Sequence, residues 1–354
     1  MIWPNTINEL LDLQYPVIQA PMFGVSTLEM VSAAAKAGCL GSLALADLSG
    51  EQCRELIRKT RSLTDKPFAV NIFVHSIPAI TDSLKEQYRE SKKFIEELAK
   101  ENGIDVELSS IEDVLLNSYH DQVDVIIEEG CKLVSFTFGN LDAESIKKLK
   151  DNNTILIGTC NSVEEALILE NSGIDIICVQ GIEAGGHRGT FETENIPQIG
   201  GLSLLSQVYE KVTVPLIYAG GIYNATTLKA AKDLGAQGFQ VGSILLASEE
   251  SALRPFEKER LQQVKENEVV LTRSFSGRYA RGIRNAFTEA LEGSAYILPY
   301  PYQNKLTGEL RKAARLVKNA DFVNIWAGQS IGCYSEHSTE EILSRLIREA
   351  ETLD

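Results

Sequence analysis

The stretch VPLIYAGGIYNATTLKAAKDLGAQGFQVGSILL, residues 214–246, decides the fold. It holds two apolar runs, 214–221 and 237–246, with a helix-like segment between them. The runs are nearly all apolar and do not alternate with polar residues, which is typical of strands buried on both faces of a parallel sheet. We therefore interpret the stretch as a strand–helix–strand unit.

The same unit recurs toward the N-terminus. Six further apolar runs precede the stretch, at residues 15–21, 41–46, 66–73, 132–139, 154–160 and 174–181. Helix-like segments follow most of them, at 26–38, 50–62, 142–151 and 162–173. Eight strands alternating with helices over about 250 residues predict a (β/α)8 TIM barrel. A doubly wound open sheet is the alternative, and the glycine motifs after the last three strands favour the barrel.

Two segments interrupt the repeat. Residues 76–130 are charged and helical, and we interpret them as the third barrel helix plus an insertion. Residues 249–325 include EVVLTRSFSG (268–277), a predicted strand, and are expected to form a small added α/β subdomain on the substrate side. The barrel is then expected to comprise residues 1–248 and 326–354, ending in a helix at 338–352.

Composition limits the partners and the compartment. The 354 residues carry a formal net charge of −15, which argues against nucleic acid and anionic membranes as partners but not against a small anionic ligand. The N-terminus lacks the pattern of a secretory signal, and no run reaches the roughly 18 apolar residues that span a bilayer. None of the six cysteines forms a C-x-x-C pair, so a reducing, cytoplasmic location is expected. The sequence is compatible with both a monomer and an oligomer.

Glycines concentrate at the ends of the last three strands, and in a barrel the active site lies at these carboxyl ends. The motifs AGGI (219–222) and VGS (241–243) offer bare backbone N–H groups and the hydroxyl of Ser243. Such groups hold a phosphate without a positive side chain, although the glycines could also serve only tight turns. We therefore predict a phosphate-bearing ligand.

His187 in QGIEAGGHRG (180–189) is the candidate acid–base group. It lies one strand away from the predicted phosphate site, and an imidazole ordinarily titrates near neutral pH. A surface turn histidine is the alternative, and His75, after the third strand, is the one rival. Trp326 and Gln329 in IWAGQ either close over a ligand or pack in the core.

Seven motifs resemble a known family. The nitronate monooxygenases, formerly called 2-nitropropane dioxygenases, are similar to QAPMFGVSTLEMVSAAAKAGCLG (19–41), VQGIEAGGHRGTF (179–191), VPLIYAGGI (214–222) and GAQGFQVGSILLASEES (235–251). The first class of that family, which oxidises propionate 3-nitronate, is similar also to SFSGRYARGIRN (274–285), PYPYQNKLTGELRKAA (299–314) and IWAGQ (325–329). The resemblance extends over almost the whole chain, in the same order.

The resemblance implies a TIM barrel that holds FMN without a covalent link, and it assigns roles to individual residues. Ala20, Pro21 and Met22 would lie against the isoalloxazine ring. Asn71 and Gln180 would contact its polar edge or the ribityl chain. The phosphate would be surrounded by Gly186, Gly220, Gly221, Gln240, Gly242 and Ser243, and Gly185 would be a further cofactor-binding residue. His187 matches the catalytic histidine, and the substrate pocket would include Tyr300, Tyr302, Trp326 and Gln329.

The implied activity is oxidative denitrification. A nitronate, or a nitroalkane after deprotonation, would reduce FMN, and O2 would reoxidise it, giving a carbonyl product and nitrite or nitrate. His187 would remove the proton from a nitroalkane or, if protonated, orient a nitronate, with Arg188 beside it. The alternatives are an FMN-dependent NAD(P)H enoyl-acyl-carrier-protein reductase, an NADH:quinone reductase of the same superfamily, and a flavin-binding sensor without turnover.

Overall fold

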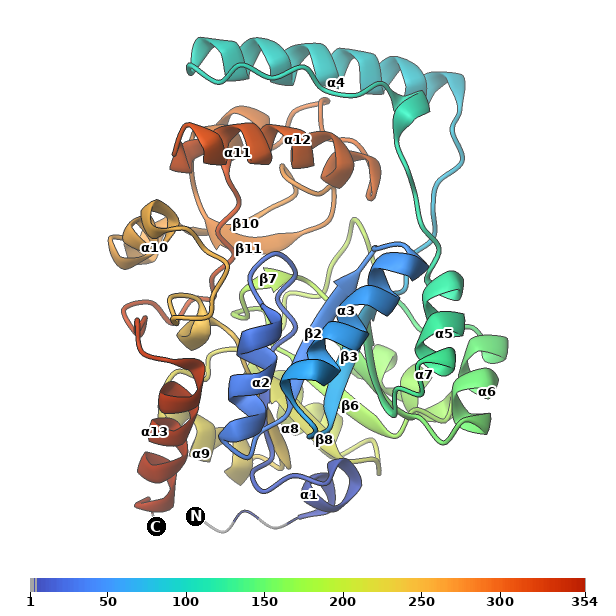
Figure 1. Cartoon of the computed structure of the whole chain (residues 1–354), viewed down its shortest axis with the longest axis vertical. Coiled ribbons are helices and arrows are strands. Elements are labelled where there is room, and N and C mark those ends of the chain that lie inside the picture. Colours follow the sequence, from blue (N-terminus) through green and yellow to red (C-terminus); the bar gives the residue numbers. More distant parts are fainter. Residues whose placement is uncertain (1–2, 4, 354) are drawn as a thin grey trace.

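Eight parallel strands form a barrel in the computed structural model, which describes residue 3 and residues 5–353 (Figure 1). The strands are β1 (Val17–Gln19), β2 (Gly41–Ala46), β3 (Phe68–Phe73), β4 (Leu133–Thr137), β5 (Ile155–Cys160), β6 (Ile176–Gln180), β8 (Leu216–Ala219) and β9 (Gly238–Val241). Their order is β1-β9-β8-β6-β5-β4-β3-β2, and a parallel bridge between Ile18 and Leu40 brings β1 back to β2. Each strand lies inside a predicted apolar run, so the prediction of a (β/α)8 barrel is confirmed.

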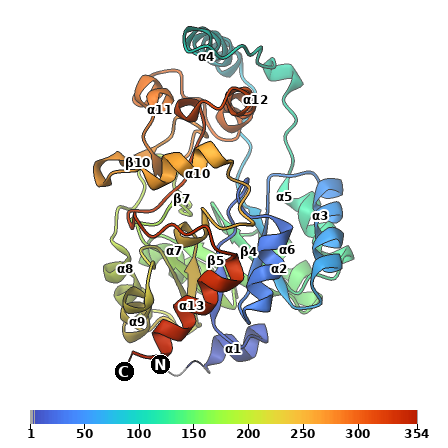
Figure 2. The same cartoon turned by 60° about the vertical axis from the view of Figure 1, so that its left-hand side comes forward.

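Helices surround the barrel (Figures 1 and 2). They are α2 (Leu28–Lys36), α3 (Gly50–Leu63), α5 (Tyr119–Glu128), α6 (Ala143–Asp151), α7 (Val163–Asn171), α8 (Gly201–Tyr209), α9 (Ala225–Asp233) and α13 (Thr339–Glu351). The last helix packs between α2 and α9 and completes the ring. Most of these helices begin at a side chain that accepts a backbone N–H, such as Thr27, Ser49 or Asn224, which fixes where each strand-to-helix turn ends.

The barrel interior is apolar at one end and polar at the other. Toward the amino ends of the strands, Ile18, Leu40 and Leu133 pack together, and α1 (Thr6–Leu11) closes this end with Ile7 and Leu11. Toward the carboxyl ends, most inward positions are polar, with Phe73 an exception. Pairs such as Ser135 and Thr137 point inward together because side chains at i and i+2 of a strand share a face. These positions line a cavity and include Asn71, Phe73, Ser135, Thr137, Thr159 and Gln180.

A second body, which we call the cover, lies over the carboxyl ends of the strands (Figure 1). It is formed by residues 76–118 and 249–325. Its elements are α4 (Asp82–Glu101), η1 (Ile111–Asp113), α10 (Pro255–Gln262), η3 (Glu266–Glu268), β10 (Val269–Thr272), β11 (Ala280–Ile283), α11 (Ala286–Leu291), α12 (Tyr302–Leu316) and η4 (Ala320–Phe322). A separate apolar core supports it, and β10 lies in the stretch 268–277 that was predicted as a strand.

The segment 76–130 contains a barrel helix and an inserted helix. The barrel helix in this segment is α5, which packs against α3 and α6. The longer α4 lies at the far end of the molecule (Figures 1 and 2), where Leu84, Tyr88 and Ile95 are buried in the core of the cover. An amphipathic pattern shows that a helix covers an apolar surface but not which surface, so the sequence alone did not say which part of 76–130 is the barrel helix.

Within the described residues, no helix combines the length and the apolar character needed to cross a membrane. All six cysteines are unpaired, and five of them are buried.

Candidate active site

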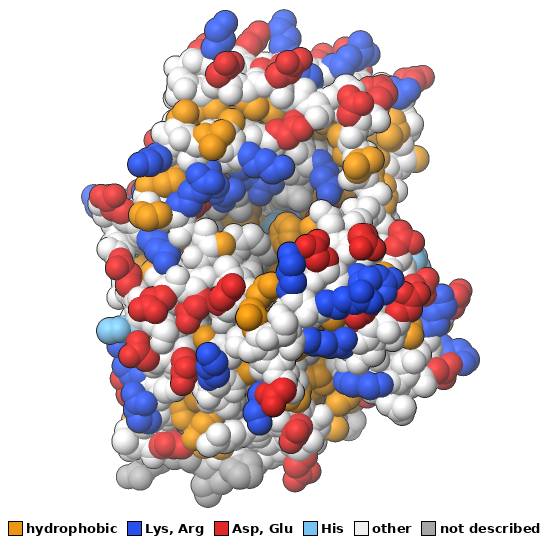
Figure 3. All heavy atoms as spheres, viewed as in Figure 1, with side chains coloured by type: hydrophobic (Ala, Val, Ile, Leu, Met, Phe, Trp, Pro, Cys, Tyr) orange, Lys and Arg blue, Asp and Glu red, His pale blue; other side chains and the backbone are white. Residues whose placement is uncertain are grey.

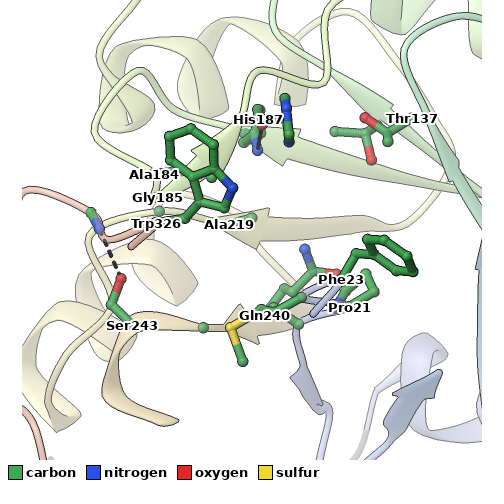
Figure 4. Close-up of a pocket in the computed structure, with 18 of the residues that line it drawn as sticks. Pro21, Phe23, Thr137, Ala184, Gly185, His187, Ala219, Gln240, Ser243 and Trp326 are labelled. Atoms are coloured by element: carbon green, nitrogen blue, oxygen red, sulfur yellow. Dashed lines mark hydrogen bonds between the residues drawn. The ribbon is translucent and has the colours of Figure 1, made fainter. Parts of the chain in front are cut away.

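One cavity lies between the carboxyl ends of the barrel strands and the cover (Figure 4). The space-filling view shows a hollow at this level of the molecule (Figure 3). Its floor is formed by Ile157, Cys178 and Ala219 from the barrel interior. The cover contributes Tyr300, Asn304, Arg311 and Asn324 to the same cavity, and Trp326 lies there just after the end of the cover. The site is therefore built from both bodies.

Most of the residues predicted for the site come together at this cavity. They are Ala20, Pro21, Met22, Asn71, Gln180, Gly185, Gly186, His187, Gly220, Gly221, Gln240, Gly242, Ser243, Tyr300 and Trp326. Residues that the sequence analysis missed also line it, among them Phe23, Phe73, Thr137, Thr159, Asn304, Arg311 and Asn324.

Two predicted pocket residues lie elsewhere. Tyr302 is buried in the core of the cover, and its hydroxyl donates to the Pro78 carbonyl oxygen at 2.7 Å. The Gln329 side chain is exposed, while its backbone N–H donates to the Glu183 carbonyl oxygen at 3.0 Å. Tyr300 lies at the cavity two positions before Tyr302, and Gly328 lies there one position before Gln329. The local sequence did not show which residue of each pair faces the cavity.

His187 lies in a short strand that the sequence analysis did not predict, β7 (Gly186–His187). It pairs with β11 of the cover, opposite Ala280, and completes a three-stranded antiparallel sheet. The imidazole sits edge-on to aromatic rings, with ring centroids 6.3 Å from Phe73 and 5.5 Å from Trp326. The glycine loop after β6 is thus held by the cover and is not a free surface turn.

A hydrogen-bond chain sets the proton position on His187. Its Nε2 lies 2.8 Å from the hydroxyl oxygen of Ser276. That hydroxyl donates to the Arg278 carbonyl oxygen at 3.0 Å and accepts the Arg278 N–H at 3.3 Å. Because the Ser276 proton is already used, Nε2 is the protonated nitrogen and Nδ1 keeps the lone pair. No partner for Nδ1 occurs among the described residues, and the imidazole borders the cavity.

The surroundings of His187 keep it neutral. Burial lowers its pKa to about 3, and the positive charges of Arg278 and Arg311 act in the same direction. The sequence analysis expected an imidazole that titrates near neutral pH. In this site the ring is neutral at physiological pH, with its one proton on Nε2 and a lone pair on Nδ1.

Ser276 was missed because it is 89 residues from His187 in the chain. Its stretch SFSG resembles an ordinary turn, and no spacing rule links it to the glycine loop.

A second feature is formed by Gly220, Gly221, Gly242 and Ser243, which we call the β8–β9 cradle. Gly220 and Gly221 have φ angles of 118° and 67°, which a residue with a side chain rarely adopts. The backbone N–H groups of these four residues have no acceptor within the part of the chain that the structure describes. Donors gathered at a glycine turn and at the start of η2 (Ser243–Leu245) suit an anionic group such as phosphate.

Two further glycines shape the wall beside the cradle. A Cβ on Gly185 would lie 2.6 Å from the Gly328 nitrogen, so the two backbones touch and neither position has room for a side chain. The Gly328 N–H donates to Ser243 Oγ at 3.0 Å, which leaves the Ser243 proton free to donate (Figure 4). The segment around Gly328, which follows the cover in the chain, is therefore hydrogen-bonded to the cradle.

Gln180 and Arg188 fix the glycine loop through hydrogen bonds to its backbone. The Gln180 amide donates to the His187 carbonyl oxygen at 3.1 Å and accepts the Gly189 N–H at 2.8 Å. Arg188 is buried and donates to the carbonyl oxygens of Gly181 and Gln180, at 2.8 and 3.2 Å. It neither faces solvent nor lines the cavity, so its visible role is to brace the loop.

The comparisons with known proteins agree with this arrangement. The family model described as nitronate monooxygenase matches residues 5–349. The chain belongs to the nitronate monooxygenase family. A probable nitronate monooxygenase of Bacillus subtilis is 37% identical over 349 residues, covering 98% of this chain and 99% of that protein. The family resemblance stated from the seven motifs is thereby confirmed, and the protein is an oxidoreductase.

Two solved structures are similar to this chain over almost its whole length. Nitroalkane oxidase from Streptomyces ansochromogenes is 32% identical with a TM-score of 0.88, over 98% of both chains. FabK from Thermotoga maritima is 25% identical with a TM-score of 0.76, over 98% of this chain and 96% of that one. The family and its neighbours are flavin-dependent oxidoreductases.

Proposed function

We propose that this protein is an FMN-dependent enzyme that oxidises alkyl nitronates with O2, releasing a carbonyl compound and nitrite or nitrate. The observation that carries the proposal is that one cavity contains two features. These are the neutral base His187 and the backbone N–H groups of the β8–β9 cradle, which have no acceptor among the described residues. The six unpaired thiols favour the cytoplasm as its compartment.

The residues at the cavity fit FMN. The β8–β9 cradle would hold its phosphate, because its four backbone N–H groups have no acceptor among the described residues and the Ser243 hydroxyl can still donate. Ala20, Pro21 and Met22 would lie along the ring. The Asn71 amide donates to Ser135 Oγ at 2.9 Å, and its oxygen, which has no hydrogen-bond partner in the described part of the chain, would face the polar edge. When bound there, FMN would supply the electron acceptor that no side chain can provide.

The chain's own residues supply the acid–base chemistry and the binding. With a nitroalkane, His187 Nδ1 accepts the proton from the carbon that bears the nitro group, while Ser276 stabilises the charged imidazole through Nε2–H. With a nitronate this step is absent, because the substrate arrives deprotonated. Phe73 and Trp326 flank the imidazole and cover part of its surface. The overall reaction balances as nitronate plus O2 giving carbonyl plus nitrate, or, with water, giving carbonyl, nitrite and hydrogen peroxide.

One experiment tests the proposal. The purified protein is examined for flavin absorbance and then mixed anaerobically with propionate 3-nitronate in the absence of any nicotinamide. Prompt loss of the oxidised flavin spectrum is the expected result. No reduction by the nitronate, together with rapid bleaching by NADH or NADPH, would overturn it in favour of a reductase. A protein that takes up no FMN would refute every flavin-based proposal.

The reductase is retained as a second candidate because the FabK structure shares this fold over 98% of the chain. An NAD(P)H-dependent enoyl-acyl-carrier-protein reductase or NADH:quinone reductase would use the same flavin position. The base at His187 favours the first proposal, since hydride transfer from a nicotinamide needs no group that removes a carbon-bound proton.

A further inference from the structure

Phe138, the residue that follows β4, has a backbone conformation that a phenylalanine rarely adopts. Its φ angle is 79°, in the left-handed region that favours glycine. Gly139 comes next, and a Cβ there would lie 2.8 Å from the Val74 carbonyl oxygen, so the chain turns tightly past the end of β3. A glycine at position 138 would make the same turn without strain. The reason for a phenyl ring at this position must therefore lie in what its side chain contacts.

The ring of Phe138 is buried at the centre of an aromatic cluster. Its centroid lies 4.5 Å from that of Phe73, 5.5 Å from that of Tyr300 and 5.4 Å from that of His187. The planes of Phe138 and His187 are nearly perpendicular, at 75°. The backbone contributes as well, because the Phe138 N–H donates to the Gly189 carbonyl oxygen at 3.1 Å. Phe138 thus contacts both the imidazole and the loop that carries it.

A buried cation lies over the same ring. The guanidinium carbon of Arg278 is 4.4 Å from the Phe138 ring centroid, which is the geometry of a cation–π interaction. Its Nη2 donates to the carbonyl oxygens of Thr190 and Glu192, at 2.6 and 3.3 Å. Among the described residues Arg278 forms no ion pair with a carboxylate, and the carboxylates of Glu165 and Glu192 act on it only as more distant charges. The aromatic face and two backbone oxygens therefore hold this charge in the interior.

These contacts close a circuit of four residues. His187 Nε2 lies 2.8 Å from Ser276 Oγ, and the Ser276 hydroxyl is hydrogen-bonded to the backbone of Arg278. The Arg278 side chain lies over Phe138, and the Phe138 ring stands against the imidazole. A single hydrogen bond at Nε2 tolerates some rotation of the imidazole about its Cβ–Cγ bond, whereas the ring contact restrains its plane. With both contacts in place the imidazole has one orientation at the cavity.

The charges around the imidazole are both positive. Arg278, in the loop before β11, and Arg311, on α12, lower the pKa of His187 in addition to the effect of burial. Neither forms an ion pair with a carboxylate within the described residues. Tyr300 is the further titratable group of the cluster, and burial raises the pKa of its hydroxyl well above the usual value, so it stays neutral. The position of one of the two cations therefore depends on the Phe138 ring.

We propose that Phe138 is a positioning residue for His187: its ring fixes the plane of the imidazole and holds the Arg278 guanidinium beside it. This role accounts for a phenylalanine in a left-handed backbone conformation. Phe138 does not itself line the cavity, so it acts only through His187. The kinetic consequence of the inference rests on the proposed function, in which His187 is the base, but the structural consequence does not.

The direct test is nitrogen NMR of the protein as purified, carrying labelled histidine, because the ring-nitrogen shifts distinguish the two neutral tautomers from the imidazolium. His187→Asn identifies the His187 signals by their loss. The wild-type protein should show the Nε2–H tautomer of His187, unchanged between pH 8 and 5. Phe138→Leu keeps most of the apolar volume but has no aromatic face, so it should show both tautomers and titrate closer to the ordinary histidine pKa of about 6.5. Phe136→Leu, the same change at a buried position of β4 that packs in the core outside the barrel, is the matched control and should behave as wild type.

Phe138→Gly separates the effect of the ring from that of the backbone. Glycine adopts a φ of 79° without strain, so this variant retains the turn and lacks the ring. It should show the same mixture of tautomers as Phe138→Leu, and it decides the matter if the leucine variant does not fold. A wild-type spectrum in Phe138→Gly would overturn the proposal. Equal changes in Phe136→Leu would also overturn it, because the effect would then be a general loosening of the strand.

Kinetics then connect the position of the imidazole to the reaction. With nitroethane, Phe138→Leu should lower kcat roughly 10–100-fold and change KM by less than about threefold, since misplacing a catalytic group by about 1 Å has an effect of this size. With ethyl nitronate, which needs no proton removal, kcat should change by less than about threefold. Equal losses on the two substrates would contradict a role through the base. If the wild-type protein oxidises neither substrate, the proposed function fails, and the NMR spectra of His187 still decide the role of Phe138.

Discussion

At the residue scale, the chemistry of the site depends on which nitrogen of His187 carries the proton. The chain Arg278–Ser276–His187 leaves Nδ1 as the lone-pair nitrogen, and burial keeps it neutral. A neutral base suits an uncharged nitroalkane, from which it can remove a proton. A neutral imidazole supplies no charge to attract an anionic nitronate, so proton removal and anion attraction fall to different groups.

Replacing His187 by Asn is expected to abolish turnover of nitroethane and to leave part of the turnover of ethyl nitronate, which needs no proton removal. Steady-state oxygen consumption with each substrate checks this. Equal losses would remove His187 from the proton-transfer step.

The pH dependence follows from the direction of the pKa shift. The neutral form of His187 is the active base, and a lowered pKa keeps it neutral down to about pH 3. We therefore expect kcat/KM for nitroethane to remain flat between pH 7 and 5. A fall by tenfold over this interval, centred near the ordinary histidine pKa of about 6.5, would contradict the buried, neutral imidazole.

Ser276→Ala removes the acceptor of Nε2–H and the support of the imidazolium. We expect kcat for nitroethane to fall roughly 10-fold or more, and kcat for ethyl nitronate to change much less, because only the first reaction charges the ring. Ser276→Thr, which retains the hydroxyl, is the conservative control. Similar effects on the two substrates would show that Ser276 serves only packing.

At the scale of elements, the barrel strands were predictable, whereas in the sheet of the cover only β10 was. A strand such as β2, buried at all six positions, leaves a continuous apolar run in the sequence. The two-residue strand β7 leaves no run, and its partner β11 is about a hundred residues away. For the same reason Ser276 and Arg311 were missed: each acquires its role only when the cover folds onto the barrel. The cradle glycines were found because local turn chemistry marks them.

The β8–β9 cradle makes a prediction about ligand choice. Ser243→Ala should weaken binding of FMN to the apoprotein roughly 10-fold, because one donor to the phosphate is lost and the Gly328 N–H loses its acceptor. Riboflavin, which lacks the phosphate, serves as the matched ligand and should bind both proteins within about threefold. Fluorescence titration of each flavin gives the values, and equal weakening would exclude a phosphate at the cradle.

At the scale of the whole molecule, the site exists only while the cover is seated on the barrel. Lys305 and the buried Asp47 join α12 to the end of β2 at 2.7 Å, and the β7–β11 pairing adds a second attachment. The position of Tyr300 and Arg311, on or beside α12, depends on the first of these.

Lys305→Met leaves Asp47 buried without its cation, so we expect a fall in Tm of a few degrees, corresponding to about 1–3 kcal/mol. KM for a nitronate should rise at the same time. Lys147→Met breaks the exposed Lys147–Asp151 pair on α6, far from the cover, and should change neither value measurably. Calorimetry gives the Tm and steady-state kinetics give the KM of both variants. The same Tm and KM in both would show that the Lys305–Asp47 pair does not stabilise the contact between the cover and the barrel.

The core that α4 shares with residues 253–325 also has a consequence for biosynthesis. When Glu101 leaves the ribosome, the larger part of this core, from Leu253 onward, has not yet been translated. At about 5–20 residues per second, the end of α12 at Leu316 follows roughly 10–40 s later. Through that interval the nascent chain displays an amphipathic helix with a largely uncovered apolar face, so a ribosome-associated chaperone is expected to bind α4.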